Sequence, residues 1–134
     1  MAGDAVVESA QAEAVRDRVV GRHVFANLYD VDPKILDDEE LLRTTCIKAA
    51  EVANMNILEV KSWKVGGRKG GVSVIILVIE SHIALHTWVE YRYATLDIYT
   101  CGERSDPWRA FDYILGVLKP KKYKVWYADR SSDT

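Results

Sequence analysis

The sequence lacks the features that identify several large classes of protein. Its 134 residues include only two cysteines, Cys46 and Cys101, which are too few for a disulfide framework and favour a reducing, intracellular setting. Eighteen basic and twenty acidic side chains give a formal net charge of −2, so no basic surface for nucleic acid is expected. The longest apolar run, residues 74–79, is too short to span a bilayer. We therefore expect a cytoplasmic protein with no nucleic-acid or membrane partner.

The length of the chain fits one domain with short polar ends. Residues 1–20 are rich in Ala, Val, Glu and Arg and lack the cationic start of a secretory signal, so we interpret them as an N-terminal extension. The domain proper is predicted at residues 21–128. Residues 129–134 are polar and are predicted to form a flexible tail.

Hydrophobic periodicity and capping residues predict the order strand, helix, several strands, helix and strand. Asp37 or Asp38 is expected to cap the first helix. Asp106, followed by Pro107, is expected to start the second. Six strands are predicted, at 22–29, 57–65, 72–79, 82–88, 94–101 and 123–127. This order is typical of an α+β fold, here an antiparallel β-sheet with two helices packed on one face.

A glycine-rich basic segment, residues 66–71, separates two of the predicted strands. Such a loop can cradle phosphate when it has Walker spacing and leads into a helix. This one has neither, because a β-branched run follows it. We interpret it as the turn of a β-hairpin.

The serine and histidine residues in the middle of the chain do not match common hydrolase or zinc motifs. Ser81 has no Gly-x-Ser-x-Gly elbow around it. His82 and His86 are four residues apart, and in a strand this spacing separates them by about 13 Å. No metal site is therefore expected. Taken singly, Ser81 would be a strand-end hydroxyl, His86 a packed histidine and Cys101 a buried thiol.

Taken together, these residues form a longer motif. Residues 80–88 read Glu-Ser-His-x-x-x-His-Thr-Trp, and residues 100–103 read Thr-Cys-Gly-Glu. Over residues 21–127 the chain resembles the prokaryotic S-adenosylmethionine decarboxylase family, whose members are small pyruvoyl-dependent decarboxylases. The resemblance implies the α/β sandwich of that family.

The resemblance also implies that the chain is a zymogen that cuts itself between Glu80 and Ser81. The products would be a β chain, residues 1–80, and an α chain, residues 81–134. The α chain would begin with a pyruvoyl group made from Ser81.

Four further positions match residues with known roles in the family. Ser73 and His86 match residues that assist the self-cleavage. Cys101 matches the cysteine that returns a proton to the substrate after carbon dioxide leaves. Glu90 matches a glutamate that binds substrate.

The implied chemistry follows from what decarboxylation requires. Loss of carbon dioxide from an amino acid leaves a carbanion, which needs an electron sink. In the family the pyruvoyl ketone forms a Schiff base with the substrate amine and acts as that sink, so neither pyridoxal phosphate nor a metal is expected. A thiol near the same carbon, as implied for Cys101, suits a general acid.

The segment before Ser73 bears on the substrate. Many family members carry there an aromatic residue that stacks on the adenine of S-adenosylmethionine. Residues 63–74 read Trp-Lys-Val-Gly-Gly-Arg-Lys-Gly-Gly-Val-Ser-Val, with glycine and basic residues where that ring is expected. In this the chain resembles a branch that decarboxylates arginine to agmatine, a polyamine precursor. We favour arginine over the other cationic amino-acid substrate. S-adenosylmethionine decarboxylation and an inactive regulatory paralogue are the alternatives.

The resemblance further implies a homodimer of αβ units or a higher oligomer. Two helices can cover only one face of the predicted sheet. If the other face were exposed to water, many aromatic side chains of the predicted strands would be exposed with it, among them Trp63, Trp88, Tyr99 and Trp126. We therefore expect subunits to pair through sheet faces or edges.

Overall fold

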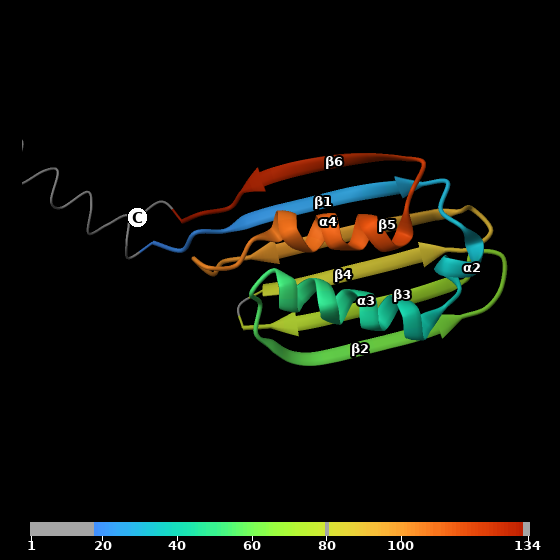
Figure 1. Ribbon diagram of the computed structural model, residues 1–134, viewed down its shortest axis with the longest axis horizontal. Helices are drawn as coiled ribbons and strands as arrows, with labels where there is room; N and C mark the ends of the chain where they lie inside the picture. Colours follow the sequence, from blue (N-terminus) through green and yellow to red (C-terminus); the bar gives the residue numbers. More distant parts are fainter. Residues whose placement is uncertain (1–17, 80, 133–134) are drawn as a thin grey trace, which may run out of the picture.

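The structure, a computed structural model, describes residues 18–79 and 81–132. A single antiparallel sheet of six strands forms one layer of the molecule, and helices form the other (Figure 1). The order across the sheet is β2-β3-β4-β5-β1-β6. In chain order the elements are β1 (Arg22–Tyr29), α2 (Pro33–Leu36), α3 (Glu39–Val52), β2 (Ile57–Val65), β3 (Gly71–Val78), β4 (Ser81–Trp88), β5 (Tyr93–Thr100), α4 (Pro107–Leu118) and β6 (Lys122–Asp129).

The two long helices begin where capping chemistry predicts. The Asp38 carboxylate accepts a hydrogen bond from the Leu41 amide at the start of α3, at 3.0 Å. The Asp106 carboxylate accepts one from the Trp108 amide at the start of α4, at 2.9 Å. These bonds satisfy amide groups that have no partner within a helix. The short helix α2 was not predicted, because four residues are too few for a periodic pattern.

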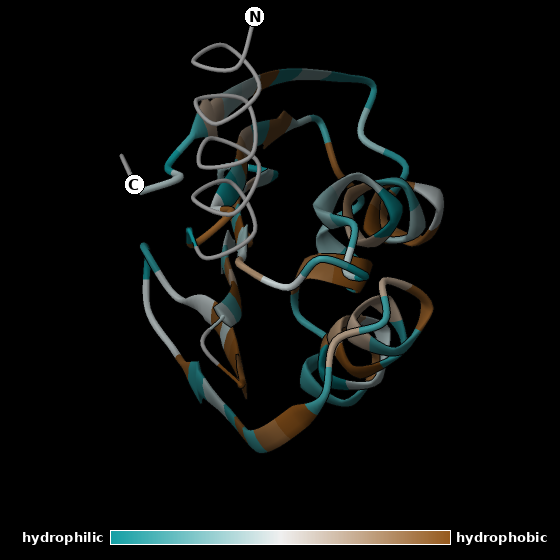
Figure 2. Cartoon of the chain, turned by 90° about the vertical axis from the view of Figure 1, so that its left-hand side faces the viewer, coloured by the Kyte–Doolittle hydropathy of each residue, from teal (hydrophilic) through white to brown (hydrophobic). Residues whose placement is uncertain are grey.

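Both long helices lie on the same face of the sheet (Figure 2). Helix α3 packs over β2, β3 and β4, and α4 packs over β1 and β5. The strand residues that face the helices alternate with residues that face away, as strand geometry requires. The fully buried core between the two layers includes Val24, Leu28, Leu42, Val74, Ile76, Ile83, Leu85, Leu96, Ile98 and Ile114. The predicted α+β sheet with two helices on one face is confirmed.

The other face of the sheet is not covered by any helix of the described residues, and we call it the open face. Large apolar side chains on it are partly exposed, including Trp63 at 44%, Leu77 at 41% and Trp126 at 44%. The Trp126 ring stacks on Phe25, with 5.7 Å between the ring centroids. An apolar surface of this kind on a sheet is typical of an interaction site.

The end of the chain differs from the prediction. Strand β6 runs to Asp129, and the amides of Arg130 and Ser132 bond to the carbonyls of Gly21 and Val19 at 2.8 and 2.9 Å. The tail predicted from residue 129 was therefore placed too early, since residues 129–132 are joined to the sheet by backbone groups that side-chain polarity does not reveal. Of the predicted extension, residues 1–17 lie outside the described part.

The close contact between residues 19–21 and residues 130–132 depends on Gly21. A Cβ atom at this position would lie 2.6 Å from the Arg130 carbonyl oxygen. A larger residue would push the two segments apart. None of the helices in the described ranges is long and apolar enough to cross a membrane.

Candidate active site

Ser81 and Cys101 lie together at one end of the sheet. The register of β4 and β5 pairs His82 with Tyr99, which places the first residue of β4 beside the end of β5. The Cys101 amide donates a hydrogen bond to the Ser81 Oγ at 3.1 Å, and the Cys101 Sγ lies 3.9 Å from the same oxygen. A hydroxyl and a thiol far apart in the sequence therefore meet in the fold.

The loop after β5 is held in place by its own hydroxyl groups. Thr100 and Ser105 are hydrogen-bonded through their side chains, and both are almost fully buried. The Ser105 hydroxyl also donates to the Gly102 carbonyl at 3.0 Å, and the Gly102 amide donates to the Thr100 Oγ1 at 3.3 Å. This network fixes the backbone on which Cys101 sits.

A small cavity opens beside this pair. Its volume is about 180 Å³, and its lining comes from the end of α3, the β3–β4 connection and the loop after β5: Asn54, Met55, Asn56, Val78, Ile79, Ser81, Thr100, Cys101, Gly102 and Ser105. Ligand pockets usually measure about 300–1,000 Å³. The cavity is thus small for a complete amino-acid site.

Ser73 and His86 form a second pair on the open face. The register of β3 and β4 places them directly opposite each other, and the Ser73 Oγ lies 2.7 Å from the His86 Nδ1. Trp63 of β2 is the next residue across the sheet, opposite Ser73. A hydroxyl bonded to an imidazole can exchange a proton with it.

The structure does not bring the two pairs together within one chain. Ser81 and His86 are five residues apart in β4, a separation of about 17 Å along a strand. An odd spacing also turns their side chains to opposite faces, so that Ser81 shares the helix side with buried Ile83 and Leu85. Each pair is well formed, but they are separate.

The remaining predicted site residues lie elsewhere. Glu80 is outside the described residues. Glu90 is exposed in the turn between β4 and β5, at the end of β4 that is far from Ser81. The neighbouring amide of Val89 bonds to the Gly70 carbonyl at 3.1 Å, which joins this turn to the glycine-rich loop.

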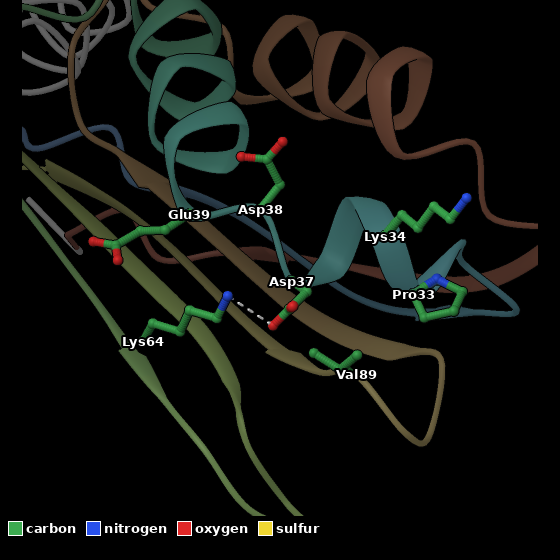
Figure 3. Close-up of a pocket in the computed structure, with 7 residues that line it drawn as sticks. All are labelled: Pro33, Lys34, Asp37, Asp38, Glu39, Lys64 and Val89. Carbon is green, nitrogen blue, oxygen red and sulfur yellow. Dashed lines mark ion pairs between the residues drawn. The ribbon is translucent and has the colours of Figure 1, made fainter.

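A larger cleft, of about 610 Å³, lies at that same far end (Figure 3). Its lining includes Asp37 and Lys64, whose side chains form an ion pair at 3.1 Å. Asp38 lies there too, but its carboxylate is used in capping α3. Neither Ser81 nor Cys101 lines this cleft.

The two cysteines differ in their surroundings. Cys46 is fully buried on α3, and burial raises its pKa to about 12. A thiol in this state is a core side chain and not a nucleophile. Cys101 is only partly buried, beside the cavity.

Known proteins similar to this chain identify its family. Residues 22–131 match the model of a protein family described as S-adenosylmethionine decarboxylase. The chain belongs to this family. The match covers every described helix and strand, and it includes both side-chain pairs.

Two curated relatives within the family are similar to this chain over most of their length. The "Arginine decarboxylase proenzyme" of Ignicoccus hospitalis is 63% identical over 118 residues, covering 88% of this chain and 82% of the relative. The protein of the same name from Hyperthermus butylicus is 58% identical over 126 residues, covering 94% of this chain and 89% of the relative.

A solved structure of the family has the same fold. It is the adenosylmethionine decarboxylase of Aquifex aeolicus VF5, with a TM-score of 0.76 and 34% sequence identity. The superposition covers 84% of this chain and 92% of that one.

Sequence reasoning missed one cluster near the candidate site. The Asp97 carboxylate is hydrogen-bonded to two histidines on the open face. Its oxygens lie 2.7 Å from the His23 Nε2 and 2.9 Å from the His82 Nε2. A signal was available, since Asp97 is the one charged residue in the sequence of β5.

Proposed function

We propose that this chain is a self-cleaving, pyruvoyl-dependent decarboxylase that converts arginine to agmatine and carbon dioxide. The observation that carries the proposal is the identity of 58–63% to two relatives named arginine decarboxylase proenzyme. The position of Ser81 beside Cys101, in a chain of this family, supports it.

The surroundings of Ser81 suit its proposed conversion. Its hydroxyl would attack the carbonyl carbon of Glu80, and the peptide nitrogen would leave to give an ester. Elimination of that ester would release the Glu80 carboxylate and leave a dehydroalanine at position 81, which water would convert to a pyruvoyl group with release of ammonia. The Cys101 amide, 3.1 Å from the Ser81 Oγ, orients that oxygen during the attack. The pyruvoyl group would supply the electron sink for decarboxylation.

Cys101 is the proposed proton donor to the substrate carbon. Its Sγ lies 3.9 Å from the oxygen of Ser81, next to the cavity that would hold the amino-acid end of the substrate. A positioned general acid typically accelerates a reaction by roughly 10²–10⁴-fold. The buried thiol of Cys46 has no access to this cavity and takes no part.

We further propose that two copies of the chain complete each site, by pairing through their open faces. If His86 assists the cleavage, it cannot do so at the Ser81 of its own chain, about 17 Å away along the strand. Ser81 is the first residue of β4, so the pairing would have to set the Ser73–His86 pair of one copy against the end of the sheet of the other, where β4 begins. The small cavity and the exposed Trp63 and Trp126 support this arrangement.

The choice of arginine over S-adenosylmethionine rests on the relatives and on the segment before Ser73. Identity to the named arginine decarboxylases is well above the 34% to the adenosylmethionine decarboxylase of known structure. Glu90, from the second copy, would supply a carboxylate for the cationic end of the substrate. A guanidinium pairs well with such a group.

Two measurements test the proposal. Intact-mass spectrometry of the purified protein should show two chains that join at residues 80 and 81, whereas Ser81→Ala should stay in one piece. Release of labelled carbon dioxide should then be measured with arginine and with S-adenosylmethionine side by side. A wild-type chain that stays uncut would refute the self-cleavage. Activity with S-adenosylmethionine alone would refute the substrate.

A further inference from the structure

Three neighbouring strands bring two histidines to one carboxylate on the open face. The Asp97 Oδ1 lies 2.7 Å from the His23 Nε2, and its Oδ2 lies 2.9 Å from the His82 Nε2. In the sheet, His23 of β1 and His82 of β4 both pair with Tyr99, two residues along β5 from Asp97. The Asp97 carboxylate therefore contacts one histidine on each of the two strands that flank β5, and both contacts run diagonally across the sheet.

Tyr99 completes the arrangement. Its ring lies between the two imidazoles, edge-on to His23 with centroids 6.0 Å apart and tilted against His82 at 5.8 Å. An ionised carboxylate only accepts hydrogen bonds, so each imidazole donates through its Nε2. Each oxygen of Asp97 accepts a hydrogen bond from one histidine, and His82 contacts both Asp97 and the Tyr99 ring.

The place of His82 in the sequence makes this arrangement important. His82 is the residue directly after Ser81, and β4 begins at Ser81. If the chain is cut between residues 80 and 81, β4 loses its covalent connection to β3 at that point. Chain ends fray unless they are tied down. His82 is then the first side chain able to hold the new terminus.

We infer that His82 is a positioning residue, which Asp97 and Tyr99 hold so that the reactive terminus stays against Cys101 after the cut. His23 braces Asp97 from the other side. The inference rests on the proposed self-cleavage, because an uncut chain would not need such an anchor. A displacement of about 1 Å at a reacting group can cost roughly 10²-fold in rate.

The test compares His82→Ala in two backgrounds. In the chain that cuts itself, the variant should still be cleaved, but its kcat for arginine should fall about 10- to 100-fold, with KM changed much less. Hydrogen exchange at the amides of residues 82–86 should become faster. In the uncut Ser81→Ala background, the same substitution should leave exchange in these residues nearly unchanged, because the connection to β3 is intact.

Two further variants keep the test decisive. Asp97→Asn preserves size but leaves one oxygen to serve two histidines, so it should show the same pattern at smaller amplitude, and it replaces His82→Ala if that variant is not cleaved. Lys48→Ala is the control, because it removes an exposed ion pair with Glu51 on α3 and touches neither the open face nor β4. It should change neither kcat nor exchange in residues 82–86.

The possible failures can be told apart. Equal acceleration of exchange in the cut and uncut backgrounds would overturn the inference, since His82 would then be a general stabiliser of the sheet. Unchanged kcat in both His82→Ala and Asp97→Asn would also overturn it. A wild-type chain that is never cut would instead refute the proposed function.

Discussion

The Ser73 hydroxyl lies 2.7 Å from the Nδ1 of His86, yet this pair points away from the helix side of the sheet, where Ser81 lies. The neighbouring strands β3 and β4 place the two residues opposite each other, so the contact follows from the strand register. Because the pair is well formed but far from Ser81 of its own chain, it suits a role at Ser81 of a second copy.

Mixing two inactive variants tests that role. Ser81→Ala and His86→Ala should each stay uncut when made alone. Co-expressed with different tags, they should form mixed dimers in which the His86→Ala chain has its own Ser81 and the partner's intact histidine. With equal amounts and random pairing, about half of the His86→Ala chains should be cut.

The Ser81→Ala chains provide the internal control, since they cannot be cut in any pairing. Mass spectrometry distinguishes the two tagged chains. No cleavage in the mixture, together with cleavage in neither single variant, would mean that His86 does not act across subunits.

Cys101→Ala should separate cleavage from decarboxylation. The backbone amide that orients the Ser81 Oγ is still present in this variant, so self-cleavage should proceed. Loss of the thiol removes the proposed proton donor, and because this proton arrives after carbon dioxide leaves, steady-state formation of agmatine should slow by roughly 10²–10⁴-fold. A loss below tenfold would assign the proton to another group.

The two thiols should react very differently with iodoacetamide at pH 8. With a pKa of about 12, Cys46 has only about one thiolate in ten thousand molecules at that pH, and it is also fully buried. Cys101 is partly exposed and should be alkylated first. Peptide mapping over time measures both rates. Labelling of Cys46 as fast as Cys101 in the folded protein would contradict the burial.

Thr87→Val should destabilise the fold, although threonine and valine side chains have similar shapes. Thr87 is only 4% exposed. Its hydroxyl donates to the Leu36 carbonyl at 2.7 Å and accepts from the Val72 amide at 2.9 Å. Valine leaves both buried backbone groups without this partner, at a cost of about 1–3 kcal/mol.

Thr44→Val is the matched control for that measurement. Thr44 is exposed on α3 and bonds only to carbonyls of its own helix. Its substitution should change the unfolding free energy by less than about 0.5 kcal/mol. Equal effects in chemical denaturation would show that the Thr87 hydroxyl does not link α2 to the sheet.

Local patterns were sufficient to predict most of the fold. The bounds of β1 and β2 agree with the alternation in the sequence, and Asp38 and Asp106 cap the helices as expected. The end of β6 was missed because its pairing with β1 extends to Asp129, opposite Arg22, and this partner is distant in sequence.

The candidate site was predictable only in part. The motif identified Ser81, His86 and Cys101, but their arrangement depends on register between strands. The odd spacing of Ser81 and His86 in one strand implies opposite faces, but the sequence prediction did not include this. The contacts of Asp97 with His23 and His82 were not predictable, because they join three strands whose order in the sheet no local pattern contains.

Strand β1 lies between β5 and β6 in the sheet, although it comes first along the chain (Figure 1). A cut between residues 80 and 81 would assign β1, β2 and β3 to one product and β4, β5 and β6 to the other. Both edges of β1 are then hydrogen-bonded to strands of the other product. The two products would be interwoven, so the cut would release no fragment. Pieces made separately would have to insert a strand into a gap between two others, which gives a physical reason for making the enzyme as one chain and cutting it only after it has folded.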